Sequence, residues 1–426
     1  MSKRVSLLLI AAFIVMLVAP VAAQDAIDCK GAEGTSVSIM ASWAGEEEET
    51  FKSILAPLLE ACNITLAYEG SRDMATILPT RVEGGAPPDI AVLANPGSLE
   101  VYAENLVALD EVGVNADNYT QGWIDQGSVD GTWVGLPVKT DIKSIVWYSP
   151  IAFEAAGYEV PTTWDEMIAL MDQMVADGGP APLSMGFESG GATGWTATDF
   201  IQDILLRTQG LEYTNGLATG ETSWTDAGVV EAWQTYVDWV NKYGAGGTEG
   251  ALTTSFGDAI LLPFQDPPGA WMVKQSGFAG SAFIQPNFED YVYGEDFAFF
   301  PLPTPDGEPA PMQVGGDFLA VFNNTPAVQA VVSYISSAEG ASSWAAAGFD
   351  LTPNSAVDLA SYTNPISADK AAALGDAPDV SYDVGDLLPG GAGSAEFEAI
   401  TAVIGGAPIE TALQNIQDTL DQAMGG

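Results

Sequence analysis

The stretch TSVSIMASWAGEEEETFKSILAPLLEACNITLAY, residues 35–68, opens an alternating pattern of strands and helices. Residues 35–41 and 64–68 predict two strands, and residues 89–93 predict a third one after a glycine- and proline-rich turn. Residues 46–61 predict a helix, which Pro57 is expected to kink. Its apolar positions share one face: Phe51, Ile54, Leu55, Leu58 and Leu59. This order of elements implies a parallel, doubly wound sheet and an α/β fold.

Further helices are predicted toward the C-terminus. A capping box at Thr163 and Glu166 opens one helix, residues 229–240 predict a second, and Thr325-Pro326 begins a third. Gly348 is placed to end the helix around Trp344. Because no low-complexity linker divides the chain, we expect two lobes with more than one connection between them.

The N-terminus has the pattern of an export signal. Lys3 and Arg4 precede an apolar run and a small-residue end, so residues 1–23 predict a signal peptide cut after Ala23. The alternative, a retained membrane anchor, needs about 20 apolar residues, more than the run supplies. An exported chain with two cysteines predicts a disulfide between Cys29 and Cys62, with lipid attachment at Cys29 as the alternative.

The composition excludes several classes of partner and reaction. Removing residues 1–23, which carry two basic residues and no acid, leaves a formal charge of −47. Nucleic acid and anionic membranes are therefore poor partners. The scarcity of lysine and arginine has two interpretations: a salt-tolerant surface, or a source organism whose exported proteins contain few basic residues. The composition does not choose between them.

The chain contains no histidine, which removes the commonest general base and metal ligand. No phosphate-binding loop, dinucleotide fingerprint or nucleophile elbow occurs either, so we expect no cofactor, no metal and no enzyme. A glycoside hydrolase that uses two carboxylates stays open as an alternative.

Five segments resemble one family. They are GSRDMATILPTRVEGGAPPDIAVL at 70–93, GTWVGLPVKTDIKSIVWYSPIAFEAAGYEVPTTWDEM at 131–167, GGATGWTATDFIQDILLR at 190–207, TSFGDAILLPFQDPPGAW at 254–271 and VGGDFLAVF at 314–322. In this order they are similar to the family 1 extracellular solute-binding proteins of carbohydrate ABC transporters, and to their α-glucoside-binding branch. The likeness spans about residues 34–424.

The resemblance implies a periplasmic-binding-protein fold of type II, in which each lobe is a doubly wound sheet and three crossovers form the hinge. By matching motifs, the crossovers fall near 137–141, 314–317 and 348–353. The expected N-lobe comprises 24–138 plus 316–349, and the C-lobe 139–315 plus 350–426. The resemblance also implies an exported, monomeric receptor, periplasmic or extracellular, that passes a sugar to a membrane permease.

Sugar recognition calls for carboxylates that accept hydroxyl hydrogen bonds and for aromatic rings that pack on C–H faces. We expect such residues in loops that follow the strands. The substrate-binding candidates are Trp43, Glu47, Arg72, Asp73, Asn95, Lys139, Asp141, Trp195, Asp266, Trp271 and Asp317. Trp271, beside the Pro267-Pro268-Gly269 turn, is the preferred single candidate.

Other interpretations of these residues remain. Arg72 with Asp73, and Lys139 with Asp141, could form structural ion pairs instead of binding a ligand. The same fold could also bind a polyamine or another small solute. The sequence does not choose among maltose, sucrose, trehalose and longer glucosides.

Overall fold

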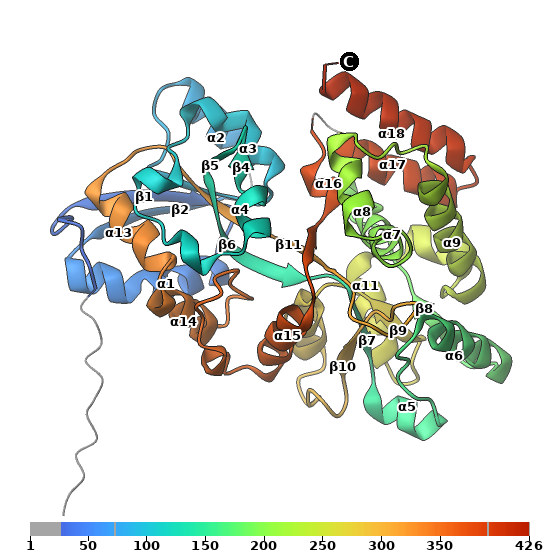
Figure 1. Ribbon diagram of the computed structural model, residues 1–426. Helices are drawn as coiled ribbons and strands as arrows, with labels where there is room; N and C mark the ends of the chain where they lie inside the picture. Colours follow the sequence, from blue (N-terminus) through green and yellow to red (C-terminus); the bar gives the residue numbers. More distant parts are fainter. Residues whose placement is uncertain (1–26, 72–73, 390–391, 426) are drawn as a thin grey trace, which may run out of the picture.

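The computed structural model describes residues 27–71, 74–389 and 392–425, which form two lobes side by side (Figure 1). Two long strands connect the lobes: β6 (Gly135–Ile142) and β11 (Met312–Val321). The expected two-lobed α/β fold is confirmed.

A six-stranded sheet forms the centre of the N-lobe, with the strand order β12-β11-β3-β1-β2 and β6 paired to β11. The strands predicted first are present as β1 (Ser36–Ala41), β2 (Thr65–Gly70) and β3 (Ile90–Leu93). β1 runs parallel to both neighbours, as expected of a doubly wound sheet. β11 runs antiparallel to β3, because this strand returns from the other lobe.

Helices cover this sheet: α1 (Glu46–Cys62), α2 (Met74–Glu83), α3 (Gly97–Tyr102), α4 (Gln121–Gln126), α13 (Pro326–Ile335) and α14 (Ala338–Ala347). The predicted helix starts and ends are confirmed. Thr325 caps α13 through its side chain, and Gly348 ends α14 in the left-handed conformation. Pro57 lies inside α1 without ending it.

The C-lobe contains a four-stranded sheet in the order β10-β7-β9-β8. Its strands are β7 (Ile145–Tyr148), β8 (Ala181–Ser184), β9 (Ala270–Lys274) and β10 (Ala298–Pro301). β8 and β9 are parallel, whereas β7 is antiparallel to β9 and β10. This sheet is therefore mixed rather than fully parallel.

The helices of this half include α5 (Pro150–Ala156), α6 (Trp164–Asp177), α7 (Trp195–Thr208), α8 (Leu211–Thr219), α9 (Ala227–Tyr243), α10 (Gly247–Thr253), α11 (Phe256–Leu261) and α12 (Gln285–Asn287). The last segment adds α15 (Pro365–Asp376), α16 (Val384–Leu387), α17 (Ala392–Ile404) and α18 (Ile409–Ala423). The predicted capping box of Thr163 and Glu166 opens α6.

The chain passes between the lobes three times. It leaves the N-lobe sheet between β6 and β7 and returns between β10 and β11. After α14, Leu351 pairs with Thr140 of β6, and the chain continues to β12 (Val380–Tyr382), which pairs with β11 in parallel. From β12 the chain passes to α16, α17 and α18, whose apolar residues pack in the C-lobe core. The hinge thus combines the antiparallel pair of β6 and β11 with the parallel pair of β11 and β12.

Two features lie close to the N-terminus. Cys29 and Cys62 are joined by a disulfide that ties the segment before β1 to the end of α1. The proposed signal peptide, residues 1–23, lies outside the described residues. Within the part of the chain that the structure describes, no helix is long and apolar enough to cross a bilayer.

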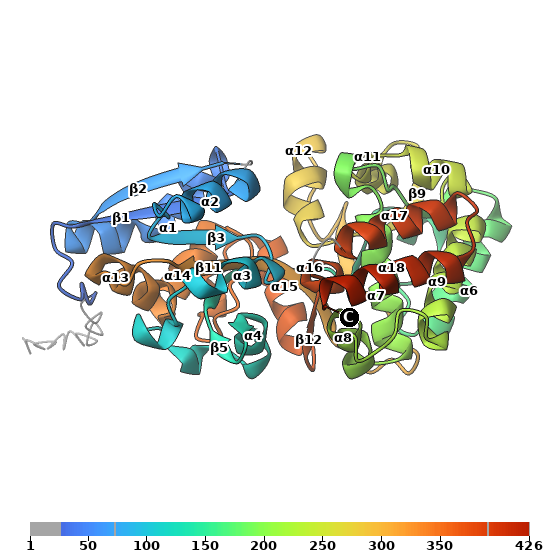
Figure 2. The ribbon, with the colours of Figure 1, turned by 90° about the horizontal axis from the view of Figure 1, so that it is seen from above.

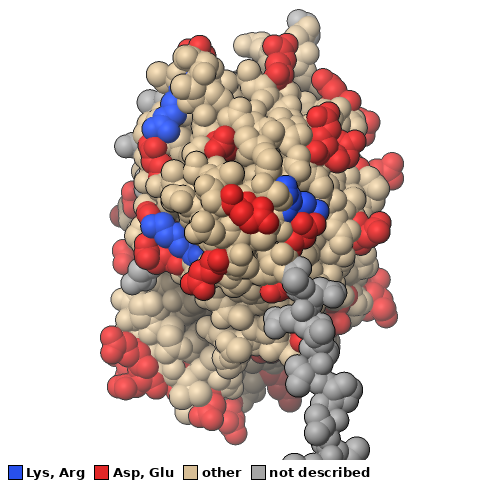
Figure 3. Space-filling model, turned by 90° about the vertical axis from the view of Figure 1, so that its left-hand side faces the viewer, with Lys and Arg blue, Asp and Glu red and all other residues tan. Residues whose placement is uncertain are grey.

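Acidic side chains are spread over the face shown in Figure 3, with few basic side chains among them. Half of the ten basic residues that follow the signal peptide contribute little to the surface, because they form ion pairs in the interior or at the hinge: Lys139, Lys143, Arg207, Lys274 and Lys370.

Candidate functional site

Charged side chains of opposite sign meet on the hinge strands. Lys139 on β6 is paired in register with Asp317 on β11, where a bulge interrupts the ladder, and the Lys139 Nζ lies 3.5 Å from an Asp317 carboxylate oxygen. Glu47, in the first turn of α1, is close enough to act electrostatically on both residues. We call Glu47, Lys139 and Asp317 the hinge charges.

The pKa values of Lys139 and Asp317 follow from burial and from the neighbouring charges. Burial lowers the pKa of Lys139, but the carboxylates of Asp317, Asp350, Glu47 and Asp141 outweigh it and hold the pKa above its ordinary value. Burial raises the pKa of Asp317 more than Lys139 and a hydrogen bond from Trp43 lower it. The hinge therefore places several carboxylates around the Lys139 ammonium.

Trp43 lies behind the hinge charges rather than beside open space. Its ring is 2% exposed and packs edge-on against Phe51, Trp344 and Phe349, with the nearest centroid at 4.7 Å. The Lys139 ammonium lies 5.2 Å from the centroid of Phe349. Trp43 thus belongs to the N-lobe core in this arrangement, and its expected role in ligand binding stays a prediction.

Four half-buried aromatic rings gather in the C-lobe: Trp195, Phe256, Phe278 and Phe283. Trp195 begins α7, Phe256 begins α11, and the other two come from the segment between β9 and α12. The ring centroids form a closed circuit of contacts at 5.4, 5.5, 5.8 and 6.3 Å. Figure 2 shows α12 on the side of the C-lobe that faces the N-lobe. We call these four rings the aromatic group.

Lys143 connects the aromatic group to buried carboxylates. Its ammonium lies 5.9 Å from the Trp195 ring centroid, 3.1 Å from Asp199 on α7, and in an ion pair with Asp383, which caps α16. Burial and the neighbouring Asp383 raise the pKa of Asp199 to about 8, although Lys143 and Lys274 lower it. Burial in this cluster therefore favours the protonated form of the Asp199 carboxyl.

Asp386 on α16 stands between the two groups. Burial raises its pKa to about 7, with further increases from Asp383 and Asp317 and a decrease from Lys143. The pKa of Asp386 therefore depends on charges in the C-lobe cluster and on Asp317 of the hinge charges. The neighbouring N-lobe loop is also close, since a Cβ on Gly97 would lie 2.9 Å from the Asp386 carbonyl oxygen.

Asn95 shapes that N-lobe loop. Its Oδ1 accepts hydrogen bonds from the backbone N–H of Ser98, at 3.0 Å, and from the Ser98 hydroxyl, at 2.7 Å. The side chain therefore holds the start of α3 against α16. Asn95 therefore lies where the two lobes meet, which we call the lobe junction. This position agrees with the expected location of Asn95 after β3.

Both carboxylate oxygens of Asp141 bind partners within the protein. One carboxylate oxygen lies 2.8 Å from the Lys370 Nζ, and the other accepts a hydrogen bond from the backbone N–H of Phe278 at 2.6 Å. Burial and Asp350 raise its pKa to about 6, against the lowering effect of Lys370. The alternative considered for Asp141, an ion pair with Lys139, is not the pair observed, because Asp141 pairs with Lys370 of α15.

The structure does not bring Asp266 and Trp271 to this junction. Trp271 packs edge-on against Tyr158 and Phe153, with centroids at 5.0 and 6.3 Å, and Asp266 is exposed. Both belong to the loop that enters β9 and to its first residues, the amino end of the strand. Ligands of open parallel sheets bind at the carboxyl ends of the strands, so this location does not favour Trp271, whose role in binding stays a prediction.

The remaining substrate-binding candidates fall into two sets by location. Glu47, Asn95, Lys139, Trp195 and Asp317 lie around the junction, whereas Arg72 and Asp73 lie outside the described residues. The sequence reasoning missed Phe278 and Asp386. A signal for Phe278 exists, because the turn residues Ser276-Gly277 follow the apolar run of β9 and mark its carboxyl end.

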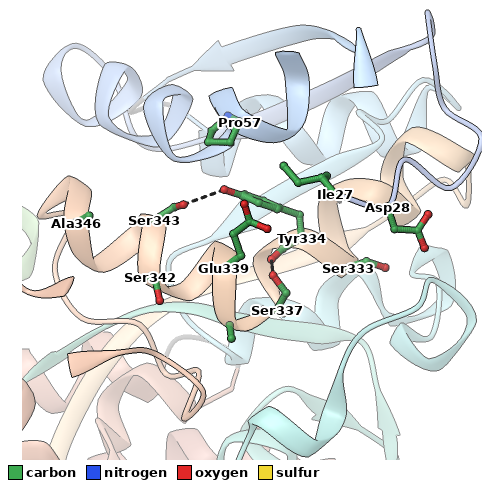
Figure 4. Close-up of a pocket in the computed structure, with 11 residues that line it drawn as sticks. Ile27, Asp28, Pro57, Ser333, Tyr334, Ser337, Glu339, Ser342, Ser343 and Ala346 are labelled. Atoms are coloured by element: carbon green, nitrogen blue, oxygen red, sulfur yellow. Dashed lines mark hydrogen bonds between the residues drawn. The ribbon is translucent and has the colours of Figure 1, made fainter. Parts of the chain in front are cut away.

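A separate groove of about 860 Å³ lies on the outer side of the N-lobe, between α1, α13 and α14 (Figure 4). Serines, Glu339 and Tyr334 line it, and the Tyr334 hydroxyl contacts the Ser343 hydroxyl at 2.9 Å. None of the hinge charges or aromatic-group residues lines this groove.

Comparisons with known proteins indicate the family of the chain. The family model for bacterial extracellular solute-binding proteins matches residues 44–342. The osmoprotective compounds-binding protein GgtB of Synechocystis is 35% identical over 390 residues, covering 89% of this chain and 91% of its own length. The alpha-glucosides-binding periplasmic protein AglE of Rhizobium meliloti is 33% identical, covering 86% of this chain and 82% of its own.

Solved structures share the fold at lower identity. The bacterial solute receptor AcbH, described with an exclusive preference for β-D-galactopyranose, superposes with a TM-score of 0.74 at 20% identity, covering 91% of this chain and 99% of that one. A chitin oligosaccharide binding protein superposes with a TM-score of 0.72 at 18% identity, covering 92% and 99%.

Proposed function

The chain belongs to the family of bacterial extracellular solute-binding proteins, and we propose that it binds an α-glucoside between its two lobes and delivers it to the permease of an ABC transporter. The observation that carries the proposal is the meeting of the hinge charges and Asp386 with the aromatic group at the lobe junction. Proteins of this family bind solutes and are not enzymes.

The two groups supply complementary halves of sugar recognition. The carboxylates of Glu47, Asp317 and Asp386 can accept hydroxyl hydrogen bonds, which are stronger for a charged acceptor. The rings of Trp195 and Phe278 offer apolar surface for the C–H face of a pyranose. The groups come from different lobes and the hinge, so a bound sugar would favour the closed arrangement over the open one.

The name of one relative supports an α-glucoside rather than another sugar. AglE is described as binding α-glucosides and GgtB as binding osmoprotective compounds. A polyamine fits the site less well, because Lys139 and Lys143 already place two ammonium groups among the carboxylates. The proposal therefore gives the carboxylates hydroxyl partners instead of additional cations.

A thermal-shift screen followed by calorimetric titration tests the proposal. Maltose, sucrose and trehalose are compared with glucose, galactose and spermidine, using the chain from residue 24 onward. A ligand at 100 times its dissociation constant adds about 2.7 kcal/mol to stability, which gives a clear rise in melting temperature. We expect the rise with at least one α-linked disaccharide and none with spermidine.

Two other results would overturn the proposal that the protein binds an α-glucoside. Tight binding of spermidine without binding of any sugar would make the protein a receptor for an organic cation. Release of glucose from a bound disaccharide, lost when one junction carboxylate is changed to its amide, would show a glycoside hydrolase.

A further inference from the structure

Lys370 connects three separate parts of the hinge. Its side chain is 2% exposed and comes from α15, and its ammonium pairs with Asp141 of β6 at 2.8 Å. The same ammonium pairs with Asp350, at the third crossover beside the Leu351 bridge to β6. One buried cation therefore joins a helix and the nearby crossover to a hinge strand that lies 229 positions away in the sequence.

The Asp141 carboxylate extends this connection to the aromatic group. Its second oxygen accepts the backbone N–H of Phe278, and the neighbouring Gly277 N–H donates to the carbonyl of Ile142 on β6 at 2.8 Å. A Cβ at Gly277 would collide with both Asp141 and Lys370, so the loop can approach this closely only with glycine. The backbone of Phe278 thus rests directly on the hinge.

We propose that Lys370 is a positioning residue, which does not touch the ligand but holds Asp141 so that the Phe278 ring and the hinge strand move as one unit. This inference rests on the proposed binding site at the lobe junction. Ligand contact at Phe278 is thereby coupled to the relative placement of the lobes.

The charges explain why the ammonium is needed. Without it, the carboxylates of Asp141 and Asp350 would face each other in a site with little access to water. An uncompensated charge of this kind is costly, and the two groups would separate or take up water. Either response loosens the contact between the Phe278 loop, β6 and the third crossover.

The test compares Lys370→Met with a control, Arg207→Met. Arg207 is a similarly buried cation, with a side chain 3% exposed, and it pairs with Asp203 on the same helix of the C-lobe. Each variant carries cysteines at the exposed positions Ala116 and Val175, one in each lobe, for measuring the inter-lobe distance by fluorescence energy transfer. Affinity for the disaccharide identified above is measured in parallel, beside a melting curve.

We expect both variants to melt earlier, but only Lys370→Met to broaden the inter-lobe distance distribution of the free protein and to weaken binding at least tenfold. Wild-type distance and affinity in a folded Lys370→Met protein would overturn the inference, as would equal affinity losses in both variants.

Asp350→Asn decides the question if Lys370→Met does not fold. Asparagine suits the left-handed backbone at position 350, where φ is 59°, and the change removes one arm of the network. A smaller change of the inter-lobe distance distribution and of the affinity, in the same direction, is expected, and no change would overturn the inference.

If the wild-type protein binds no sugar, the proposed function fails. The distance distribution of the free protein still tests the role of Lys370 in that case.

Discussion

The Trp195 ring is half-buried at the start of α7, with Phe256 and Phe278 beside it and the Lys143 ammonium near its centroid. If this ring packs on a pyranose, Trp195→Ala removes an aromatic anchor and should cost about 2 kcal/mol of binding free energy. That corresponds to a loss of about 30-fold in affinity, measurable by calorimetric titration with the disaccharide that binds best.

Trp271→Ala is the matched control, because it makes the same substitution in the same lobe. Its ring packs on Phe153 and Tyr158 at the other end of β9, so stability should fall while affinity stays unchanged. Lost affinity in a folded Trp271→Ala protein, with Trp195→Ala binding normally, would return the site to the loop before β9.

Asp199 gives a pH dependence of stability with a defined sign. Its pKa is about 8 in the folded protein, against an ordinary value of 3.8, so the folded state holds the proton more tightly. Folding stability from this group is therefore fully present below about pH 4 and is lost as the pH rises toward 8. Asp199→Asn, which keeps the neutral shape, should gain stability relative to the wild-type protein as the pH rises through this window.

Urea unfolding at pH 5, 7 and 9 measures this difference, which can grow by up to about 1.4 kcal/mol per pH unit. Asp203→Asn is the opposite case. Its carboxylate pairs with Arg207 and Lys274, which hold its pKa below the ordinary value despite burial. That variant should lose stability at neutral pH, and the same pH trend in both variants would contradict the assignment.

At the scale of elements, the disulfide joins the segment before β1 to the end of α1. Its loop spans a sequence separation of 33 residues, and closing a loop of this length should stabilise the fold by about 3 to 4 kcal/mol in the chain-entropy model. A Cys29→Ser, Cys62→Ser variant should unfold at a correspondingly lower urea concentration. Intact mass with and without reductant, on protein from the exported fraction, provides the check, since two free thiols would contradict the bond.

At the scale of the whole molecule, the formal charge of −47 after residue 23 predicts a salt dependence. Half of the basic residues after that point serve as internal counter-ions, so little positive charge is left to screen the acidic surface (Figure 3). Potassium chloride should raise the melting temperature by several degrees, mostly at low concentration, because the Debye length is already about 3 Å at 1 M. A melting temperature independent of salt below that range would favour the interpretation in which few basic residues merely reflect the source organism.

Features set by neighbours along the chain were predictable from the sequence. The α1 stripe, the capping box of Thr163 and Glu166, and the end of α14 at Gly348 each depend on residues within a few positions, so periodicity and capping chemistry identify them. The order of the motifs was likewise sufficient to indicate the family and its two lobes.

The composition of the site depended on contacts between distant segments, which local patterns do not encode. Asp141 pairs with a lysine 229 positions away, and the aromatic group draws its rings from three segments. The sequence suggested Trp271 because a tryptophan beside a stiff turn has the right chemistry, whereas the strand direction places it at the amino end of β9. Only the tertiary structure decides which end of a strand faces the lobe junction, because side-chain chemistry is identical at both ends and the direction of the strand is set by its pairing partners.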